Sequence, residues 1–443
     1  MIRLQQKKKN WIKLIVFVCI AWGAFASSYQ PSITFPKELR LMTGAQMPLH
    51  VPLPALATAT VSNPEVVELK GEGMSQIGPY LKRPMTMLSK HRGESDLTFH
   101  LFGKVPIKSV HVSVLPEIRV VPGGQSIGVK LKSQGVLVVG HHHLKKEEQG
   151  REKSPVFVGD YILSINGGKV RGVQDVARTI QEAGQQKQTV TLEVLRKGKK
   201  KDVVVKPQYD DSEGIYRIGL YIRDSAAGVG TLTFFDPKNE VYGGLGHVIA
   251  DIDTGEPIKV GGGHVVRSNV TSIERGTSGE PGEKRAIFMQ ENHVLGSIVR
   301  NTSFGIFGVM KHSPDGGQYK EPIPVGLAEQ VKEGPAEILT VIEGQKVERF
   351  TIEILHVTDQ KFPATKGMII RITDPKLLEK TGGIVQGMSG SPIIQDGKLI
   401  GAVTHVFVND PTSGYATFIE WMLRDAGSFP QTAGLQPAPL FSL

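Results

Sequence analysis

A short turn of small residues near the carboxyl end constrains the fold of this chain more than any other feature. Residues 387–392 are Gly-Met-Ser-Gly-Ser-Pro, and an apolar pair follows at 393–394. Gly397 then turns the chain into a second apolar run at 399–403. Glycine on both sides lets the backbone fold tightly around Ser389, and apolar runs separated by glycine indicate strands joined by a hairpin. The order turn, strand, hairpin, strand predicts that Ser389 lies at the rim of a β-barrel.

The composition favours the same class of fold. The chain has 443 residues, of which 51 are glycine and 27 are proline, and its hydrophobic content is 40%. Many glycines and prolines favour short strands and turns over long helices, so we expect a mainly β protein. The length is sufficient for two or three domains, each with its own core.

Ser389 lies where a nucleophile would be placed. A serine hydroxyl attacks a carbonyl group when a base takes its proton, and the developing oxyanion needs converging N–H donors. The backbone N–H groups of Gly387 and Ser389 are the candidates for this oxyanion hole. Ser391 is then a structural neighbour of the nucleophile. The alternative is a Gly/Ser hairpin turn with no chemistry.

The best candidate for the base is His247. Residues 243–246 (Gly-Gly-Leu-Gly) precede it and an apolar run follows it, so we expect its imidazole in a tight apolar setting. It also lies far upstream of Ser389, in the order His, Asp, Ser of chymotrypsin-like enzymes. His264, which follows three glycines, is the second candidate. His405 follows the nucleophile on a predicted strand, which suits a substrate-binding wall better than a general base.

A buried carboxylate has to orient the imidazole of the base. Asp374 ends the apolar run 367–373 and precedes Pro375, so it lies at the end of a strand close in sequence to Ser389. Its alternative role is the N-cap of a helix that begins directly after it. Three other aspartates between the histidine and the serine occupy turns and loops that are typically solvated: Asp251, Asp253 and Asp315.

A compact module is predicted in the middle of the chain, at residues 116–207. Within it, residues 156–167 combine a Gly-Asp turn, an apolar strand and an Asn-Gly turn, and a helix is expected at 173–183. This order resembles the PDZ domain, which binds an extended peptide by adding it as a strand to the edge of a sheet. The loop that receives the peptide is then Ser126-Ile127-Gly128-Val129, and its alternative is an ordinary entry into a strand.

Residues 1–28 have the form of an export signal. Positive charges at Arg3 and 7–9 precede an apolar stretch from about 14 to 26, which falls short of a membrane span even when it is extended back to Trp11. A cleaved signal and a retained anchor both fit, and both predict a cytoplasmic amino terminus and an exported body. The only cysteine, Cys19, lies inside this stretch, so the body has neither a disulfide nor a cysteine nucleophile.

The net charge of +9 does not predict a nucleic-acid partner. The positive residues gather at the amino terminus and at 196–201, the expected tip of a hairpin, and no zinc-finger spacing accompanies them. The triplet His-His-His at 141–143 does not predict a metal site, because adjacent side chains of an extended chain point to opposite faces. No cofactor is predicted. Residues 29–115 are expected to form a small β region or a linker, and residues 431–443 a tail.

Residues 387–423 resemble the end of chymotrypsin-like serine peptidases, in which such a turn precedes a hairpin, a substrate-pairing strand and a terminal helix that contains a tryptophan. Trp421 occupies the expected helix. The resemblance implies a chymotrypsin-like β-barrel in which Thr404-His405-Val406 pairs with the backbone of the substrate. It also implies a specificity pocket near residues 381–383, where no acid is present that would favour basic side chains.

The order of export segment, small β region, PDZ module and peptidase domain at 208–430 resembles the stage IV sporulation protein B peptidases of endospore-forming bacteria. The matching elements are residues 244–249 (Gly-Leu-Gly-His-Val-Ile), the strand that ends in Asp374, and the turn 387–392. The resemblance implies the catalytic triad His247, Asp374 and Ser389.

The same resemblance implies a biological role. Members of this family are signalling proteases that are made in the forespore, cross its membrane and process themselves near the amino terminus. They then cleave a membrane-bound regulator, which frees an intramembrane metalloprotease to activate the late mother-cell sigma factor. The expected location is the space between the two membranes around the forespore. The PDZ module is expected to control self-processing and target recognition.

Two other functions fit the same sequence. One is a PDZ-based adaptor whose peptidase-like domain only holds partners together. The other is an exported quality-control protease, although such enzymes commonly place the protease before the PDZ domain. Labelling of Ser389 by a fluorophosphonate separates the adaptor from a protease. Broad digestion of unfolded casein separates the quality-control enzyme from a signalling protease.

Overall fold

The computed structural model describes residues 38–49, 53–54, 57–71, 75–77, 80–82, 85–142, 154–289, 294–312, 314–360 and 362–430. The chain divides into two compact units, residues 1–117 and residues 118–443. The predicted export segment at 1–28 and the predicted tail at 431–443 lie outside the described residues. None of the helices in the described ranges combines the length and the apolar character that a membrane span requires.

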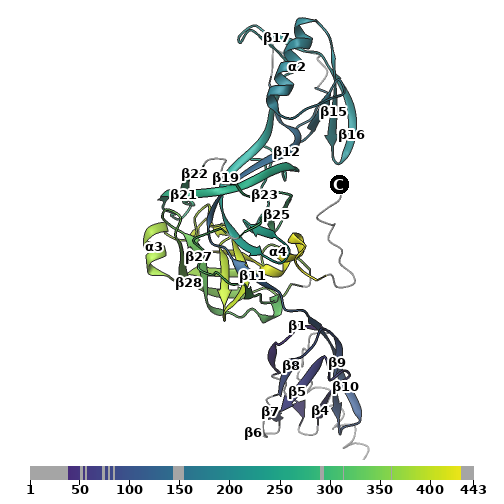
Figure 1. Ribbon diagram of the computed structural model, residues 1–443, viewed down its shortest axis with the longest axis vertical. Helices are drawn as coiled ribbons and strands as arrows, with labels where there is room; N and C mark the ends of the chain where they lie inside the picture. Colours follow the sequence, from purple (N-terminus) through teal and green to yellow (C-terminus); the bar gives the residue numbers. More distant parts are fainter. Residues whose placement is uncertain are drawn as a thin grey trace, which may run out of the picture. The chain divides into compact units, whose positions relative to one another are not determined.

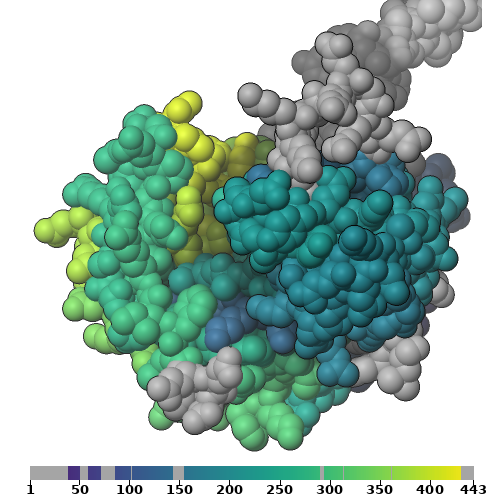
Figure 2. All heavy atoms as spheres, turned by 90° about the horizontal axis from the view of Figure 1, so that it is seen from above, coloured from purple at the N-terminus to yellow at the C-terminus, as the bar shows by residue number. Residues whose placement is uncertain are grey.

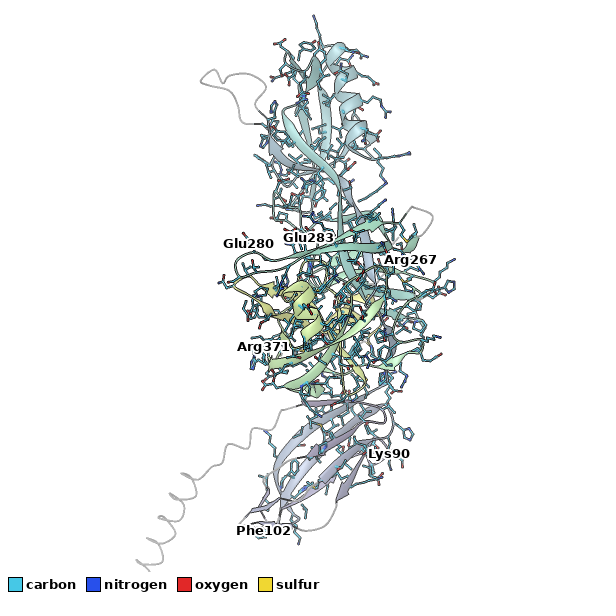
Figure 3. All side chains as sticks on the ribbon, turned by 90° about the vertical axis from the view of Figure 1, so that its left-hand side faces the viewer. Lys90, Phe102, Arg267, Glu280, Glu283 and Arg371 are labelled. Atoms are coloured by element: carbon cyan, nitrogen blue, oxygen red, sulfur yellow. The ribbon has the colours of Figure 1, made fainter. Side chains whose placement is uncertain are left out.

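The first unit consists of short strands around a core of its own (Figure 1). A four-stranded sheet has the order β1-β10-β9-β4, and a three-stranded sheet has the order β2-β8-β5. Leu41, Val67, Met87 and Phe99 are fully buried in the core. Phe102, labelled in Figure 3, lies in the turn between β9 and β10 and is exposed. The small β region predicted before residue 116 is confirmed.

The strands of this unit are β1 (Glu38–Met42), β2 (Gln46–Leu49), β3 (Leu53–Pro54), β4 (Ala57–Val61), β5 (Val67–Gly71), β6 (Ser75–Ile77), β7 (Tyr80–Lys82), β8 (Met85–Ser89), β9 (Gly93–Leu101) and β10 (Val105–Leu115).

The second unit holds the PDZ module and the peptidase domain. Its elements up to the end of the PDZ module are β11 (Arg119–Pro122), β12 (Ser126–His141), β13 (Tyr161–Ile165), β14 (Gly168–Lys169), α2 (Val173–Gln185), β15 (Val190–Arg196), β16 (Lys199–Val205), β17 (Gln208–Asp210), β18 (Ile215–Arg217) and β19 (Leu220–Asp236). Those of the peptidase domain are β20 (Val241–Gly244), β21 (Val260–Glu274), β22 (Glu283–Phe288), β23 (Val294–Ser297), β24 (Arg300–Thr302), β25 (Gly305–Val309), β26 (Ile323–Pro324), η2 (Ala328–Gln330), β27 (Gly334–Val341), β28 (Val347–Val357), β29 (Met368–Ile372), α3 (Pro375–Thr381), β30 (Pro392–Gln395), β31 (Lys398–Phe407), β32 (Asp410–Phe418) and α4 (Ile419–Ala426).

In the PDZ module, a sheet of order β16-β15-β13-β12-β19 packs against α2 (Figure 1). Val176, Ile180 and Ala183 recur along α2 at helical spacing, and all three are buried against the sheet. The Gly-Asp turn of the sequence motif places Asp160 in the interior, where its carboxylate accepts hydrogen bonds from the Arg196 guanidinium and from the Phe157 N–H. The predicted helix and hairpin are therefore present.

Two long strands, β12 and β19, belong to both modules. The second half of β12 pairs with β13, and the start of β19 pairs with β12 in the PDZ sheet. The first half of β12 lies between β19 and β21 in the first sheet of the peptidase domain. The predicted boundary at residues 207 and 208 falls between β16 and β17, and β19 returns beyond it to the PDZ sheet.

The prediction that Ser126-Ile127-Gly128-Val129 receives the PDZ peptide is wrong in this structure. These residues begin β12 and are hydrogen-bonded on one side to residues 228–231 of β19 and on the other to 265–267 of β21. An added peptide strand needs a free sheet edge, and here neighbouring strands occupy both edges. The helix α2 instead lies beside β18 and β19, where the Asp224 carboxylate accepts a hydrogen bond from the Val173 N–H.

The second half of the peptidase domain is a closed barrel of order β27-β28-β29-β32-β31-β30. Its core holds Ile338, Phe350, Ile370 and Phe418, all buried, and α4 covers it with Trp421, as the sequence predicted for the terminal helix. The mainly β fold, with a PDZ domain and a β-barrel protease domain, is confirmed.

The nucleophile turn, residues 387–392 with the predicted nucleophile Ser389, lies where the first sheet meets this barrel. Gly390 has φ +91°, and a Cβ atom there would lie 2.2 Å from the Thr231 carbonyl oxygen and 2.4 Å from the Leu245 nitrogen. Only glycine permits this conformation and this close approach. The glycine that the sequence places after Ser389 therefore brings the two halves of the domain together at the turn.

Candidate active site

A cavity of about 520 Å³ opens between the first sheet and the barrel. Figure 2 shows the surface of the unit hollowed between teal atoms and the green and yellow atoms of the peptidase domain. The cavity walls are Val129 of β12, residues 226–229 of β19, Leu245 with 247–250 after β20, 384–387 with Ser389, and 404–406 of β31. The cavity thus gathers Gly387, Ser389 and His247, which the sequence analysis had chosen from distant segments.

Hydrogen bonds to two carbonyl groups set the orientation of the candidate oxyanion hole. The Gln386 carbonyl accepts from the Lys284 N–H at 2.9 Å, and the Met388 carbonyl accepts from the Ser391 N–H at 2.9 Å. A trans peptide points its N–H away from its carbonyl, so the N–H groups of Gly387 and Ser389 face the other way. In the described part of the chain, neither N–H has a hydrogen-bond acceptor. Both are available to an oxyanion.

Ser391 supports the turn from inside. It is fully buried, and its hydroxyl donates to the Met388 carbonyl oxygen at 2.6 Å. This bond adds to the one from its own N–H, so Ser391 holds the peptide that carries the Ser389 N–H.

The Ser389 hydroxyl donates to the Thr404 carbonyl oxygen at 2.8 Å. This bond holds the side chain against β31. A rotation about one side-chain torsion is enough to release it, because serine occupies staggered rotamers of similar energy.

His247 presents one nitrogen to its own loop. Its Nδ1 lies 2.9 Å from the Val248 carbonyl oxygen, which accepts a hydrogen bond from the ring N–H. In this tautomer Nε2 carries the lone pair that a general base needs. Asn301 fixes the loop, because its amide donates to the Ile249 and Ile258 carbonyl groups and accepts from the Ile249 N–H.

His405 lies beside His247, with ring centroids 5.3 Å apart. Burial, and then the positive charges of His247 and Lys366, lower the pKa of His405. The His405 ring therefore stays neutral in the range where an ordinary histidine begins to take up a proton, and it does not add a positive charge next to His247.

Asp374 does not reach this pair. Its carboxylate accepts from the Leu377 N–H at 3.1 Å and from the Thr351 N–H at 3.5 Å, which makes it the N-cap of α3. It is not among the residues that line the cavity. The structure thus gives Asp374 the alternative role that the sequence had left open, and its place in a triad stays a prediction.

The other aspartate and histidine candidates do not line the cavity. The buried Asp251 carboxylate binds Arg223 and Thr254, whose hydrogen bonds outweigh burial and lower the pKa of Asp251. Arg267, labelled in Figure 3, pairs with Asp315 at 2.8 Å. His264 lies within β21 opposite Lys130 and is not part of the cavity wall.

The predicted substrate strand lines the cavity, whereas the place of the predicted specificity pocket is filled by other residues. Thr404, His405 and Val406 form one wall of the cavity, as expected for residues that line a binding site. The space at 381–383 is filled instead, because a Cβ atom at Gly382 would lie 2.3 Å from the Gly276 carbonyl oxygen of the β21–β22 hairpin. The side of the cavity next to the nucleophile is lined by Ile384 and Val385.

Sequence reasoning missed Lys284. Its side chain is 1% exposed and its ammonium group donates to the Thr340 hydroxyl at 2.7 Å. Lys284 stands between Glu283 and Arg285, and such a charged run usually indicates exposed residues. The one signal of its burial is strand alternation, which places Lys284 on the same face as Ala286 and Phe288. Burial lowers the pKa of Lys284 to about 7.

Metal ligation has no support at this site: across the described residues, His, Cys, Asp and Glu side chains do not gather in groups of three or more that could hold an ion.

Lys284→Met is expected to change the pH dependence of stability. The ordinary lysine pKa is 10.5 and the folded value is about 7, so between these values the unfolded chain binds more protons. Stability of the wild type then rises with pH across this window and is lowest below it. The melting temperature of Lys284→Met should exceed that of the wild type most at about pH 6 and progressively less toward about pH 9. Parallel curves for the two proteins would contradict this, and Lys320→Met, at an exposed lysine, is the control.

Asp374→Ala is expected to lower the free energy of unfolding by about 1 kcal/mol, because it removes the N-cap of α3. Asp374→Asn should leave stability unchanged, since asparagine caps helices as well as aspartate. Denaturant unfolding of both variants measures the effect. Equal destabilisation by alanine and asparagine would mean that the charge, and not the cap, stabilises the fold.

Comparisons with known proteins match two segments of the chain. Residues 214–423 match the family SpoIVB peptidase S55, and residues 126–206 match the PDZ domain. A crystal structure of the Rv3671c protease from M. tuberculosis in its active form is similar over 48% of this chain and 78% of that chain, with 18% sequence identity and a TM-score of 0.26. None of the curated proteins matches the chain. The chain is therefore a PDZ-containing peptidase whose peptidase domain matches the SpoIVB peptidase S55 family, as its motifs predict.

Proposed function

We propose that the protein is a serine endopeptidase in which Ser389 is the nucleophile and His247 the general base. The observation that carries the proposal is the cavity itself, which brings Ser389, His247 and the free N–H groups of Gly387 and Ser389 to one place. These are the parts that acyl transfer needs: a nucleophile, a base and a site for negative charge.

The reaction begins when the Ser389 hydroxyl turns from the Thr404 carbonyl toward Nε2 of His247. Nε2 takes the proton while the serine oxygen bonds to the substrate carbonyl carbon, and the carbonyl oxygen becomes an oxyanion held by the N–H groups of Gly387 and Ser389. The imidazolium then protonates the leaving amine as the C–N bond breaks. His247 then takes a proton from a water molecule, which attacks the acyl-enzyme. The imidazolium returns that proton to the Ser389 oxygen as the acyl group leaves.

Asp374 enters this proposal through the family resemblance. The Val248 carbonyl oxygen holds Nδ1 of His247 in the structure, which fixes the tautomer that the base requires. A catalytic role for Asp374 therefore requires a rearrangement that frees its carboxylate from α3. Since Asp374→Asn preserves the cap, loss of activity in this variant at an unchanged melting temperature would support such a role.

The substrate is a protein segment that lies extended along β31. His405 and Val406 pair with β32 on one side, while residues 404–406 face the cavity on the other. A substrate strand added to this edge places its scissile bond near Ser389. The PDZ module supplies a second peptide-binding function, for the chain's own amino-terminal segment or for a partner.

The biological role we propose is that of a sporulation signalling protease. It is exported across the forespore membrane, processes itself near the amino terminus, and cleaves a membrane-bound regulator that controls an intramembrane metalloprotease. The match of residues 214–423 to the SpoIVB peptidase S55 family supports this role, and the apolar stretch of the export segment supports membrane association.

The test compares amino-terminal processing and fluorophosphonate labelling of the full-length chain with Ser389→Ala, His247→Ala and Ser391→Ala at matched expression. Processing and labelling should disappear in the first two variants. Ser391→Ala should retain both with a slower rate, because the Ser391 N–H still holds the Met388 carbonyl when the hydroxyl is removed.

Other outcomes point to other functions. Processing that survives in Ser389→Ala means that a host protease cuts the chain or that the nucleophile is another residue. An unlabelled wild type that still binds partners is the adaptor. Broad digestion of unfolded casein by the wild type identifies a quality-control protease.

A further inference from the structure

The hairpin formed by β21 and β22 leaves the first sheet and lies across the barrel. Gly276 donates its N–H to the Thr381 carbonyl at 2.9 Å, and Gly279, at the tip, donates to the Val408 carbonyl at 2.8 Å. Figure 3 labels Glu280 and Glu283 on this hairpin. The hairpin therefore contacts the segment before the nucleophile turn and the loop after β31, both of which continue into the cavity wall.

Beside the nucleophile turn, the hairpin forms a two-bond bridge to Gln386. The Gln386 N–H donates to the Gly282 carbonyl at 2.8 Å, and the Gln386 carbonyl accepts from the Lys284 N–H at 2.9 Å. The second bond fixes the plane of the peptide between Gln386 and Gly387. Since the N–H of a trans peptide points opposite to its carbonyl, this bond also fixes the direction of the Gly387 N–H.

The Lys284 side chain reinforces the bridge. A Cβ atom built at Gly387 would lie 3.1 Å from Cβ and 3.3 Å from Cδ of Lys284, so the alkyl chain lies flat against the glycine. The ammonium group continues inward to the Thr340 hydroxyl on β27. Lys284 thus touches the first sheet by its backbone, the nucleophile turn by its alkyl chain, and the barrel by its amine.

We propose that the β21–β22 hairpin keeps the oxyanion hole in its donor orientation and that Lys284 is the positioning residue through which it acts. The proposal rests on the proposed function, because it assigns a residue to the same acyl transfer. Lys284 touches neither the substrate nor the reacting atoms, and its effect passes through the Gln386–Gly387 peptide.

The turn needs such an external hold. Gly387 has φ +90°, and a glycine adopts the alternative orientations of its peptide at little cost. If the Gln386 carbonyl lost its partner, the peptide would be free to turn and present that carbonyl to the cavity. A carbonyl oxygen in the hole repels the oxyanion that the Gly387 N–H would have bound.

The energetics of Lys284 agree with a positioning role. A buried lysine whose amine is hydrogen-bonded to one neutral hydroxyl costs stability relative to an apolar residue of similar length. Its neighbours in the hairpin, Glu283 and Arg285, are exposed, and among the described residues the hydrogen-bond partner of the amine is the neutral Thr340 hydroxyl. Groups that reduce stability are concentrated at functional sites, which is where this lysine lies.

The experiment measures kcat and KM of the full-length protein for a peptide substrate in the wild type, Lys284→Ala, Lys284→Met and Arg285→Ala. Lys284→Ala keeps the backbone N–H that binds the Gln386 carbonyl but removes the alkyl cover over Gly387. It should lower kcat by about 10-fold with KM little changed, which is less than the ~100-fold expected when an oxyanion donor is lost completely. Lys284→Met keeps the alkyl cover over Gly387 and should recover most of the rate. Arg285→Ala, at the exposed neighbour, should match the wild type.

A second readout separates positioning from a loss of folding. A peptide boronic acid forms a tetrahedral adduct with Ser389 and places an oxygen in the hole, whereas the product peptide does not. Lys284→Ala should weaken binding of the boronic acid much more than binding of the product peptide. If Lys284→Ala does not fold, Ser278→Ala, which removes the exposed hydrogen bond from the Ser278 hydroxyl to the Asn409 carbonyl at the hairpin tip, should lower kcat in the same direction.

Unchanged kcat in folded Lys284→Ala, or in Ser278→Ala if that variant replaces it, overturns the proposal, as does equal weakening of boronic acid binding and product binding. These results are distinct from failure of the proposed function, in which the wild type itself neither hydrolyses the peptide nor is labelled by a fluorophosphonate.

Discussion

The candidate active site of this peptidase depends on the backbone of the nucleophile turn, which both halves of the domain hold by its carbonyl groups. From the first sheet, Thr231 donates its N–H to the Ser389 carbonyl and its hydroxyl to the Gly387 carbonyl. Thr233 adds a hydroxyl bond to the Gly390 carbonyl. From the barrel, Val403 donates its N–H to the Ser391 carbonyl. Each carbonyl that is held fixes a peptide plane, and these planes adjoin the peptides that carry the N–H groups of Gly387 and Ser389. Tertiary contacts therefore hold the part of the turn from which both donors project.

The strand that provides these threonines also belongs to the PDZ module. The start of β19 lies beside α2, its end lies against the nucleophile turn, and residues 226–229 between them form part of the cavity wall. Near its start, Arg223 binds Asp251 and Asp253 in the loop that follows His247. One strand therefore contacts the PDZ sheet, the loop that follows His247 and the nucleophile turn.

The features that sequence predicted well are those whose evidence is local. Ser389 lies between glycines that a tight turn requires, His247 follows its own glycine-rich approach, and the PDZ motif encodes a strand and two turns in order. Asp374 shows the limit of local evidence, since an aspartate before a proline is as good a helix cap as it is a strand-end carboxylate. The segment 126–129 was misplaced because strand pairing on both of its edges comes from residues about 100 or more positions away.

Lys284 could not be found in this way, because nothing adjacent to it in the sequence marks it as buried. Its environment is made by Gln386 and Thr340, which reach it only after the hairpin has crossed onto the barrel. Glycine allows the peptides of such a turn more than one orientation at similar energy, so contacts from elsewhere in the fold have to stabilise one of them. An oxyanion hole completed by a distant hairpin forms only when the first sheet and the barrel are assembled, and catalytic competence is then a property of the whole domain.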